Sequence, residues 1–248
     1  MDLSQILPIP DIMQAKRVIA FSPHPDDNEM GAGGTLAKLA QSGAEILWAV
    51  ASDGSVGTED KAASADSLAA VRREEQEVAA RLLGGRGVSW MGFTDTHLRD
   101  NPPAVEFKVV ELIRSYCPDF VFCPDPWLPY EAHPDHRTLG HAVSTALLMV
   151  NFRLAYPDAG AAVAAPSIAY YGSAWPNTLV DISDTFQRKL DALMAHKSQF
   201  TPPFDQQIQM YLTLQAVSLG ESIGVARGEA FKVLTHHHLH FNVDAWKS

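Results

Sequence analysis

The chain has 248 residues, of which 46% are apolar and 19% charged, with 16 glycines and 16 prolines. This composition is typical of a globular protein and excludes disordered, collagen-like and coiled-coil chains. The 29 acidic and 19 basic residues give a net charge of -10, so we expect neither nucleic acid nor an anionic membrane surface as a partner.

Targeting and redox signals are sparse. Two cysteines, Cys117 and Cys123, are too few for a disulfide framework and are not spaced as a zinc or redox pair, which favours a reducing compartment. The amino terminus has no basic region followed by an apolar one, so we expect no secretory signal and a cytoplasmic protein. Prolines and glycines interrupt the uncharged stretch 159–180, which we interpret as loop and buried strand rather than a membrane span.

Short apolar runs alternate with helical segments over the first 150 residues. Strands are expected at 17–22, 45–51, 88–93 and 120–123, and helices at 35–40, 68–82, 104–116 and 136–150. This alternation predicts an α/β fold, a Rossmann-like three-layer α/β/α sandwich with a mainly parallel sheet.

Beyond residue 156 the alternation is less regular. We expect short strands at 168–171 and 178–182 and helices near 184–199 and 205–219. No linker separates these segments from the rest, so we expect one domain over 1–248, with a core of about 17–150 that 151–248 completes.

Two polar clusters follow predicted strands, at 22–29 and at 131–136. Ligands of open parallel sheets bind beyond the carboxyl ends of the strands, where these clusters fall. Zn²⁺ accepts His nitrogen and Asp oxygen, and a catalytic site keeps about three protein ligands, a number that His24, Asp27 and His136 would supply. Asp26, the neighbour of Asp27, would then be the general base that takes a proton from water.

The second cluster offers an acid for the same reaction. An amide hydrolase must stabilise an oxyanion and protonate an amine leaving group, and His133 could serve both needs. Asp135 would raise the pKa of His133 toward the imidazolium form.

Simpler interpretations exist for each cluster. An Asp-Asp pair after a parallel strand can be a helix cap or a Mg²⁺ and phosphate site, and His-Pro-Asp-His can be a turn. The occurrence of both clusters at predicted strand ends in one chain favours a metal site.

These motifs resemble a known family. His24-Pro25-Asp26-Asp27, followed by Gly31-Ala32-Gly33-Gly34-Thr35 and by His133-Pro134-Asp135-His136, is similar to the PIG-L/LmbE-like family of zinc-dependent de-N-acetylases. The runs at 52–54, 72–75, 94–96 and 123–131, with 199–200 and 220–221, look like the branch that acts on diacetylchitobiose. The similarity spans nearly the whole chain from Arg17 onward.

The resemblance implies roles for individual residues. His24, Asp27 and His136 would bind Zn²⁺, Asp26 would be the base, and His133 the acid and oxyanion stabiliser. Arg72 and Asp95 match positions that hold sugar hydroxyls, although they could equally be surface and turn residues. His240 matches a tail histidine that helps to line the substrate site, either in its own chain or in a neighbouring subunit. The role of Glu29 is left open, because Asn28 separates it from the Asp pair.

Three further features have alternative explanations. Trp127 could stack on a sugar face or anchor its proline-rich loop. The run His236-His237-His238 could be a second metal cluster, but consecutive side chains on an extended chain point to different sides, which favours surface placement. Gly31 to Gly34 lack the third glycine of a dinucleotide fingerprint, so they are better explained by close packing of a helix end.

The expected function is removal of the N-acetyl group from small saccharides that contain N-acetylglucosamine, such as N,N'-diacetylchitobiose or the free sugar. The alternatives are the same zinc chemistry on another glucosamine conjugate, such as a thiol-linked one, a non-catalytic metal or sugar-binding module, and a Mg²⁺ phosphatase. The branch resemblance also implies a homo-oligomer, with a hexamer as one option.

Overall fold

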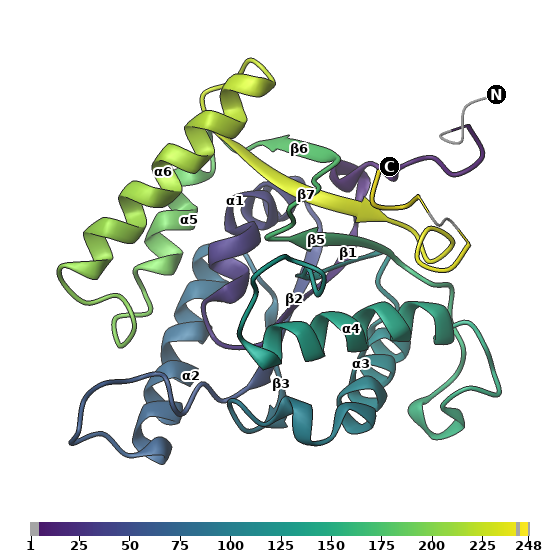
Figure 1. Ribbon diagram of the computed structural model, residues 1–248, viewed down its shortest axis with the longest axis horizontal. Helices are drawn as coiled ribbons and strands as arrows, with labels where there is room; N and C mark the ends of the chain where they lie inside the picture. The colour runs from purple at the N-terminus through teal and green to yellow at the C-terminus, as the bar shows by residue number, and fades with distance from the viewer. Residues whose placement is uncertain (1–4, 242–243, 248) are drawn as a thin grey trace.

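The computed structural model describes residues 5–241 and 244–247. Within these residues seven strands form one sheet in the order β3-β2-β1-β4-β5-β7-β6 (Figure 1). Neighbours from β3 to β5 pair in parallel, whereas β7 lies antiparallel between β5 and β6. The strands are β1 (Arg17–Ser22), β2 (Glu45–Ser52), β3 (Gly87–Phe93), β4 (Phe120–Pro124), β5 (Ser167–Tyr171), β6 (Thr178–Asp181) and β7 (Gly228–Leu234).

Helices cover both faces of this sheet. On one side are α1 (Asp27–Gln41), α2 (Ala65–Leu82), α5 (Phe186–Leu193) and α6 (Phe204–Ser222). On the other, α3 (Pro102–Tyr116) and α4 (Pro134–Met149) lie side by side (Figure 1). Short 3-10 helices occur at η2 (Ile12–Gln14), η3 (Leu98–Asp100) and η4 (Pro157–Ala159).

The two core layers follow from the period of the strands. In β1, Val18 and Ala20 point into the cluster under α1 and α5, while Ile19 and Phe21 point into the cluster under α3 and α4. A strand buried on both faces needs an unbroken apolar run, and this is the pattern that the sequence shows at 18–21. The predicted three-layer α/β/α fold is confirmed.

Helix α1 begins earlier than predicted. It starts at Asp27 rather than near Thr35, and therefore contains the glycines at 31, 33 and 34. A Cβ at Gly31 would overlap the Tyr171 ring, and one at Gly34 would lie 2.8 Å from a side-chain carbon of Ile182. These glycines thus serve close packing on β5 and on the residue after β6, which offsets their poor helix propensity.

The carboxyl-terminal part also differs from expectation. Strand β7 was not predicted, and the expected helix near 184–199 is the shorter α5. The stretch 159–180 contains β5, as expected of a loop and buried strand. Among the described residues, no helix has the length and apolar character that a membrane crossing requires.

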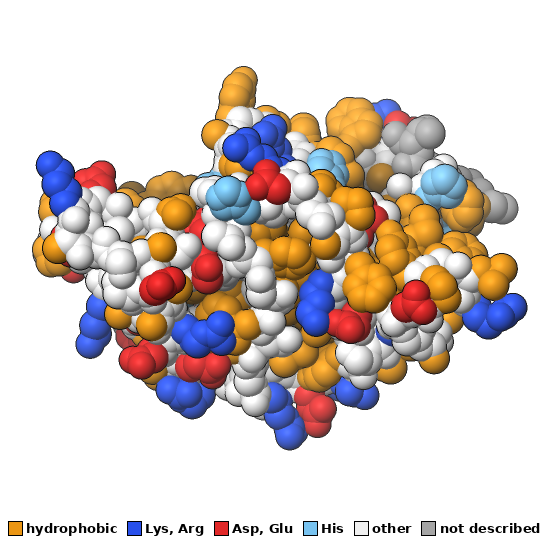
Figure 2. Space-filling model, turned by 90° about the horizontal axis from the view of Figure 1, so that it is seen from below, with side chains coloured by type: hydrophobic (Ala, Val, Ile, Leu, Met, Phe, Trp, Pro, Cys, Tyr) orange, Lys and Arg blue, Asp and Glu red, His pale blue; other side chains and the backbone are white. Residues whose placement is uncertain are grey.

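Lys and Arg side chains are interspersed with Asp and Glu on the face shown in Figure 2.

Candidate active site

The two polar clusters meet at one edge of the sheet. One follows β1, and the other lies between β4 and the first turn of α4. Because β1 and β4 pair directly and in parallel, their carboxyl ends are neighbours and the two loops lie together. This juxtaposition joins residues more than a hundred positions apart in the sequence.

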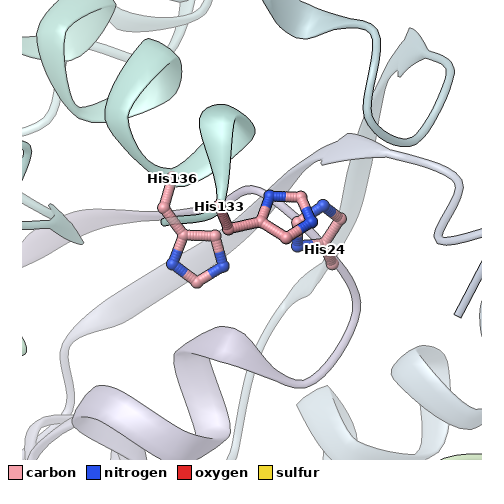
Figure 3. Close-up of side chains that lie close together, drawn as sticks. All are labelled: His24, His133 and His136. Carbon is pink, nitrogen blue, oxygen red and sulfur yellow. The ribbon is translucent and has the colours of Figure 1, made fainter. Parts of the chain in front are cut away.

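Three histidines converge there. His24 lies in the loop after β1, whereas His133 caps the amino end of α4 and His136 lies in its first turn (Figure 3). The ring centroids of His24 and His133 are 4.5 Å apart, and those of His24 and His136 are 5.4 Å apart. One possible ligand atom from each of the three lies within 4.8 Å of the other two.

Asp27 bridges two of these histidines. Its Oδ2 lies 3.2 Å from His24 Nδ1, and its Oδ1 lies 3.4 Å from His136 Nε2. Burial alone would raise the pKa of Asp27, but the charge of His136 and the hydrogen bond and charge of His24 hold this pKa well below its usual range. These contacts favour the ionised form of the Asp27 side chain.

This donor set fits a divalent metal. Atoms bound at about 2.0–2.1 Å to a tetrahedral ion lie about 3.3 Å from one another, and the two oxygens of Asp27 lie at 3.2 and 3.4 Å from a nitrogen of His24 and of His136 respectively. Two imidazoles and one carboxylate suit zinc as well as several other divalent ions, so the donor types alone do not select the metal.

Further carboxylates surround His24. Its Nε2 lies 3.1 Å from Asp95 Oδ1 and 3.3 Å from Asp135 Oδ2. Burial alone would lower the pKa of His24, but Asp135, Asp27 and Asp95 together raise it to about 12. In a metal complex, Nδ1 would face the ion beside Asp27, and the Nε2–H would donate to Asp135, which would fix the tautomer.

Glu131 has the same relation to His136. Its Oε2 lies 3.3 Å from His136 Nδ1, and its Oε1 accepts the backbone N–H of His133 at 2.8 Å. Glu131 opens the second polar cluster, and no role for it is predicted from the sequence. A carboxylate two residues before the His-Pro-Asp-His run is a signal that could have indicated one.

Asp26 lies beside the predicted ligands but is held from a different side. Arg72 donates to Asp26 Oδ2 at 3.0 Å, and also to the carbonyls of Pro25 and Gly54 at 2.6 and 3.1 Å. Burial and the neighbouring charge of Asp27 raise the pKa of Asp26 to about 8, against the opposing effect of Arg72 and His24. The helix-cap alternative is wrong, because the Asp26 side chain makes no capping bond to α1.

The predicted pairing of Asp135 with His133 requires correction. The Asp135 carboxylate accepts the N–H groups of Thr96 and Leu98 and contacts His24, while only the backbone N–H of Asp135 reaches His133, at Nδ1. Burial and the neighbouring His24 and His136 lower the pKa of His133, and the charge of Asp135 only partly offsets them. Asp135 thus orients His24 rather than charging His133.

The predicted substrate-binding residues lie in different places. Arg72 and Asp95 are both buried against the site, where they contact Asp26 and His24. Trp127 is half exposed and lines a cavity of about 270 Å³ with Trp175 and Trp246. Asp125 borders both this cavity and the hollow that Asp27 and His136 line.

His240 lies far from the site of its own chain. It lines a small hollow with Met149 at the carboxyl end of α4, whereas His136 lies in the first turn. Thirteen residues of helix separate the two ends, a rise of about 20 Å. His236 and His237 line the same hollow, and within the described residues they belong to no group of metal-binding geometry.

Comparison with known proteins gives consistent matches. Residues 19–147 match the family model described as PIG-L, GlcNAc-PI de-N-acetylase. The diacetylchitobiose deacetylase of Thermococcus kodakarensis is 37% identical over 230 residues, which cover 91% of this chain and 85% of the relative. A probable N-acetyl-alpha-D-glucosaminyl L-malate deacetylase 2 of Bacillus cereus is 28% identical, over 74% of this chain and 84% of that protein.

A solved structure is similar throughout. The N,N'-diacetylchitobiose deacetylase from Pyrococcus horikoshii, in complex with its inhibitor MPG, superimposes with a TM-score of 0.87 at 36% identity. The match covers 93% of this chain and 88% of that one.

Proposed function

This chain belongs to the GlcNAc-PI de-N-acetylase (PIG-L) family and is an amide-hydrolysing de-N-acetylase, and from that premise we propose its substrate and metal. We propose a Zn²⁺-dependent hydrolase that removes acetyl groups from small saccharides containing N-acetylglucosamine, such as N,N'-diacetylchitobiose or N-acetylglucosamine itself. Acetate and a free amino sugar are the products. The observation that carries the proposal is the 37% identity to diacetylchitobiose deacetylase over nearly the whole chain, joined to a His-Asp-His set with a second carboxylate beside it.

The metal would be held by His24, Asp27 and His136. A bound Zn²⁺ would make a water molecule more acidic and polarise the acetyl carbonyl group. Asp135 and Glu131 would keep the two imidazoles in the tautomers that ligation needs, since each faces the ring nitrogen remote from Asp27.

Asp26 would take the proton of the attacking water. Arg72 binds its Oδ2, so Oδ1 is the oxygen left to act as the base. As the water oxygen bonds to the acetyl carbon, the amide C–N bond breaks and the nitrogen must gain a proton.

His133 would serve the leaving group and the oxyanion. Its Nδ1 accepts the backbone N–H of Asp135, so in the neutral ring the proton is on Nε2. This Nε2–H would donate a hydrogen bond to the oxyanion and, once the ring has taken up the proton that Asp26 removed from water, protonate the leaving nitrogen as the C–N bond breaks. His133 is then neutral again and Asp26 is again a carboxylate.

The proposal extends to assembly and location. His240 cannot reach the site of its own chain, so a role in substrate binding requires a neighbouring subunit, which favours a homo-oligomer. We also propose a cytoplasmic enzyme. Light scattering on the purified protein, with and without a His240→Ala change, would measure the oligomeric state separately from activity.

The test of function is acetate release by the purified protein. N,N'-diacetylchitobiose and N-acetylglucosamine are compared with and without a chelator, beside an Asp26→Ala variant. We expect chelator-sensitive release that falls about 10²- to 10⁴-fold in the variant while its metal content stays unchanged. Acetate release from N-acetylglucosaminyl malate or from an N-acetylated thiol-linked glucosamine, but from neither sugar, would refute the proposed substrate and keep the proposed chemistry.

A further inference from the structure

We infer that Gln76 on α2 is a positioning residue that holds the proposed base Asp26 in its working conformation. The inference rests on the proposed function, because it concerns how the base is held. Gln76 Oε1 accepts the backbone N–H of Asp26 at 3.1 Å, across 50 residues of sequence. Arg72, one helical turn earlier on α2, binds the Asp26 side chain, so one helix face grips both the backbone and the carboxylate.

The conformation of Asp26 needs such support. Its φ of 99° and ψ of -24° lie in the left-handed region, which non-glycine residues rarely adopt. An Asp at the start of a helix usually turns its side chain back to cap the first backbone N–H groups. Asp26 makes no such bond, and its carboxylate points instead to Arg72 beside the histidines.

A buried carboxylate fixes the direction of the Gln76 amide. Glu29 Oε1 accepts from Gln76 Nε2 at 2.9 Å and from Trp48 Nε1 at 3.0 Å. The amide must present its NH₂ group to Glu29, which leaves its carbonyl oxygen facing the Asp26 N–H. Trp48, Glu29 and Gln76 are all fully buried, so the network has little freedom to move.

This network also assigns a role to Glu29, which the sequence analysis left open. Among the described residues, Glu29 makes no hydrogen bond to a proposed ligand or acid-base residue, and its hydrogen bonds reach Asp26 only through Gln76. A series of hydrogen bonds thus runs from Trp48 on β2 through Glu29 on α1 and Gln76 on α2 to the backbone N–H of Asp26.

The first test is Gln76→Met, which keeps the volume and removes both hydrogen bonds. Steady-state kinetics on diacetylchitobiose should show kcat reduced about 10- to 100-fold with KM within about twofold, since misplacement of a reacting group acts on the chemical step. Bound metal should stay unchanged, because the variant touches no proposed ligand. In an Asp26→Asn background the same change should lower kcat by less than about twofold, since Gln76 acts through Asp26.

A donor-acceptor swap guards against a variant that fails to fold. Glu29→Gln combined with Gln76→Glu keeps the charge of the cluster, the acceptor for the Asp26 N–H and an acceptor for Trp48. We expect the double variant to retain kcat within about fivefold, and Gln76→Glu alone, with two facing carboxylates, to lose more.

Three outcomes would overturn the inference: an unchanged kcat in Gln76→Met, an equal loss in the Asp26→Asn background, or a swap as inactive as Asp26→Asn with an unchanged melting temperature. Failure of the proposed function gives a different result, namely a metal-loaded wild type that releases no acetate. Hydrogen exchange of the Asp26 amide would then still report on the contact, because Gln76→Met should expose it and an unchanged protection would refute the role.

Discussion

Asp135→Asn tests whether a carboxylate behind His24 tunes the proposed metal site. Asp135 is fully buried, and its Oδ2 accepts from the Thr96 N–H at 2.7 Å and faces His24 Nε2 at 3.3 Å. Its Oδ1 accepts the Leu98 N–H at 3.3 Å. Asparagine has the same shape but offers one acceptor oxygen and no charge.

The expected magnitude follows from these three contacts. In Asp135→Asn, the amide oxygen should take the place of Oδ2, which faces both the Thr96 N–H and His24 Nε2. The amide NH₂ group must then face the Leu98 N–H, which loses its acceptor. Replacing charged by neutral acceptors costs about 1 kcal/mol for each of two bonds, and the unpaired Leu98 N–H about 1–3 kcal/mol. The free energy of unfolding should fall by about 3–5 kcal/mol, and metal affinity by about 10- to 100-fold, the usual effect of losing a carboxylate behind a ligating histidine.

The assay is competition for Zn²⁺ against a chelator of known affinity, with urea unfolding of the metal-free protein measured in parallel. Asp100→Asn is the matched control, because Asp100 is exposed on η3, the 3-10 helix whose Leu98 N–H binds Asp135, and contacts only His97 among the described ion pairs. The control should leave the affinity within about twofold, since an exposed pair contributes little. Equal affinities for Asp135→Asn and wild type would refute the reasoning, as would a loss of the same size in Asp100→Asn.

Four further predictions concern other parts of the molecule. Arg114 donates to the carbonyls of six residues between 149 and 160, so Arg114→Met should lower the free energy of unfolding in urea by about 3–5 kcal/mol, and a change below about 1 kcal/mol would contradict this. Chelation should lower the calorimetric melting temperature, because metal at about 100 times its Kd contributes about 2.7 kcal/mol, and an unchanged midpoint would speak against a bound ion. Burial and Glu106 raise the pKa of Tyr156 from 10.0 to about 12, so the stability that the Tyr156–Glu106 hydrogen bond contributes is present below pH 10 and is lost as the pH rises toward 12. Urea unfolding should show that wild type loses stability relative to Tyr156→Phe between these pH values, and an equal pH dependence of the two proteins would contradict this. Trp127→Ala should raise KM for diacetylchitobiose about two- to tenfold with little change in kcat if the indole stacks on a sugar, and an unaltered KM would favour a loop anchor.

Much of the fold could be predicted from local pattern. The apolar runs at β1, β2 and β4 occur within a few residues of the observed strands, because a strand buried on both faces must be apolar at nearly every position. The predicted run at β3 also matches its strand, although β3 lies at the edge of the sheet and is only partly buried. The start of α1 could not be predicted in this way. Its glycines are poor helix formers, and only Tyr171 and Ile182, more than a hundred residues away, explain why they are there.

Part of the candidate site could likewise be predicted from the sequence, and part could not. His24, Asp27 and His136 were expected together because both motifs follow parallel strands, and the direct pairing of β1 with β4 brings them within reach. The contact of the Asp135 carboxylate with His24 could not be predicted, because it depends on the direction of side chains across two loops.

The sequence by itself determined the fold class, the family and the chemical types at the site, because these depend on periodicity and on short motifs whose residues are neighbours in the chain. Tertiary structure alone decided the left-handed turn at Asp26, the grip of Gln76 on that turn and the distance of His240 from its own site. The physical reason is that a buried hydrogen bond or a close approach joins residues by position in space. A motif specifies what a side chain can do, and the packing of distant elements specifies what it faces.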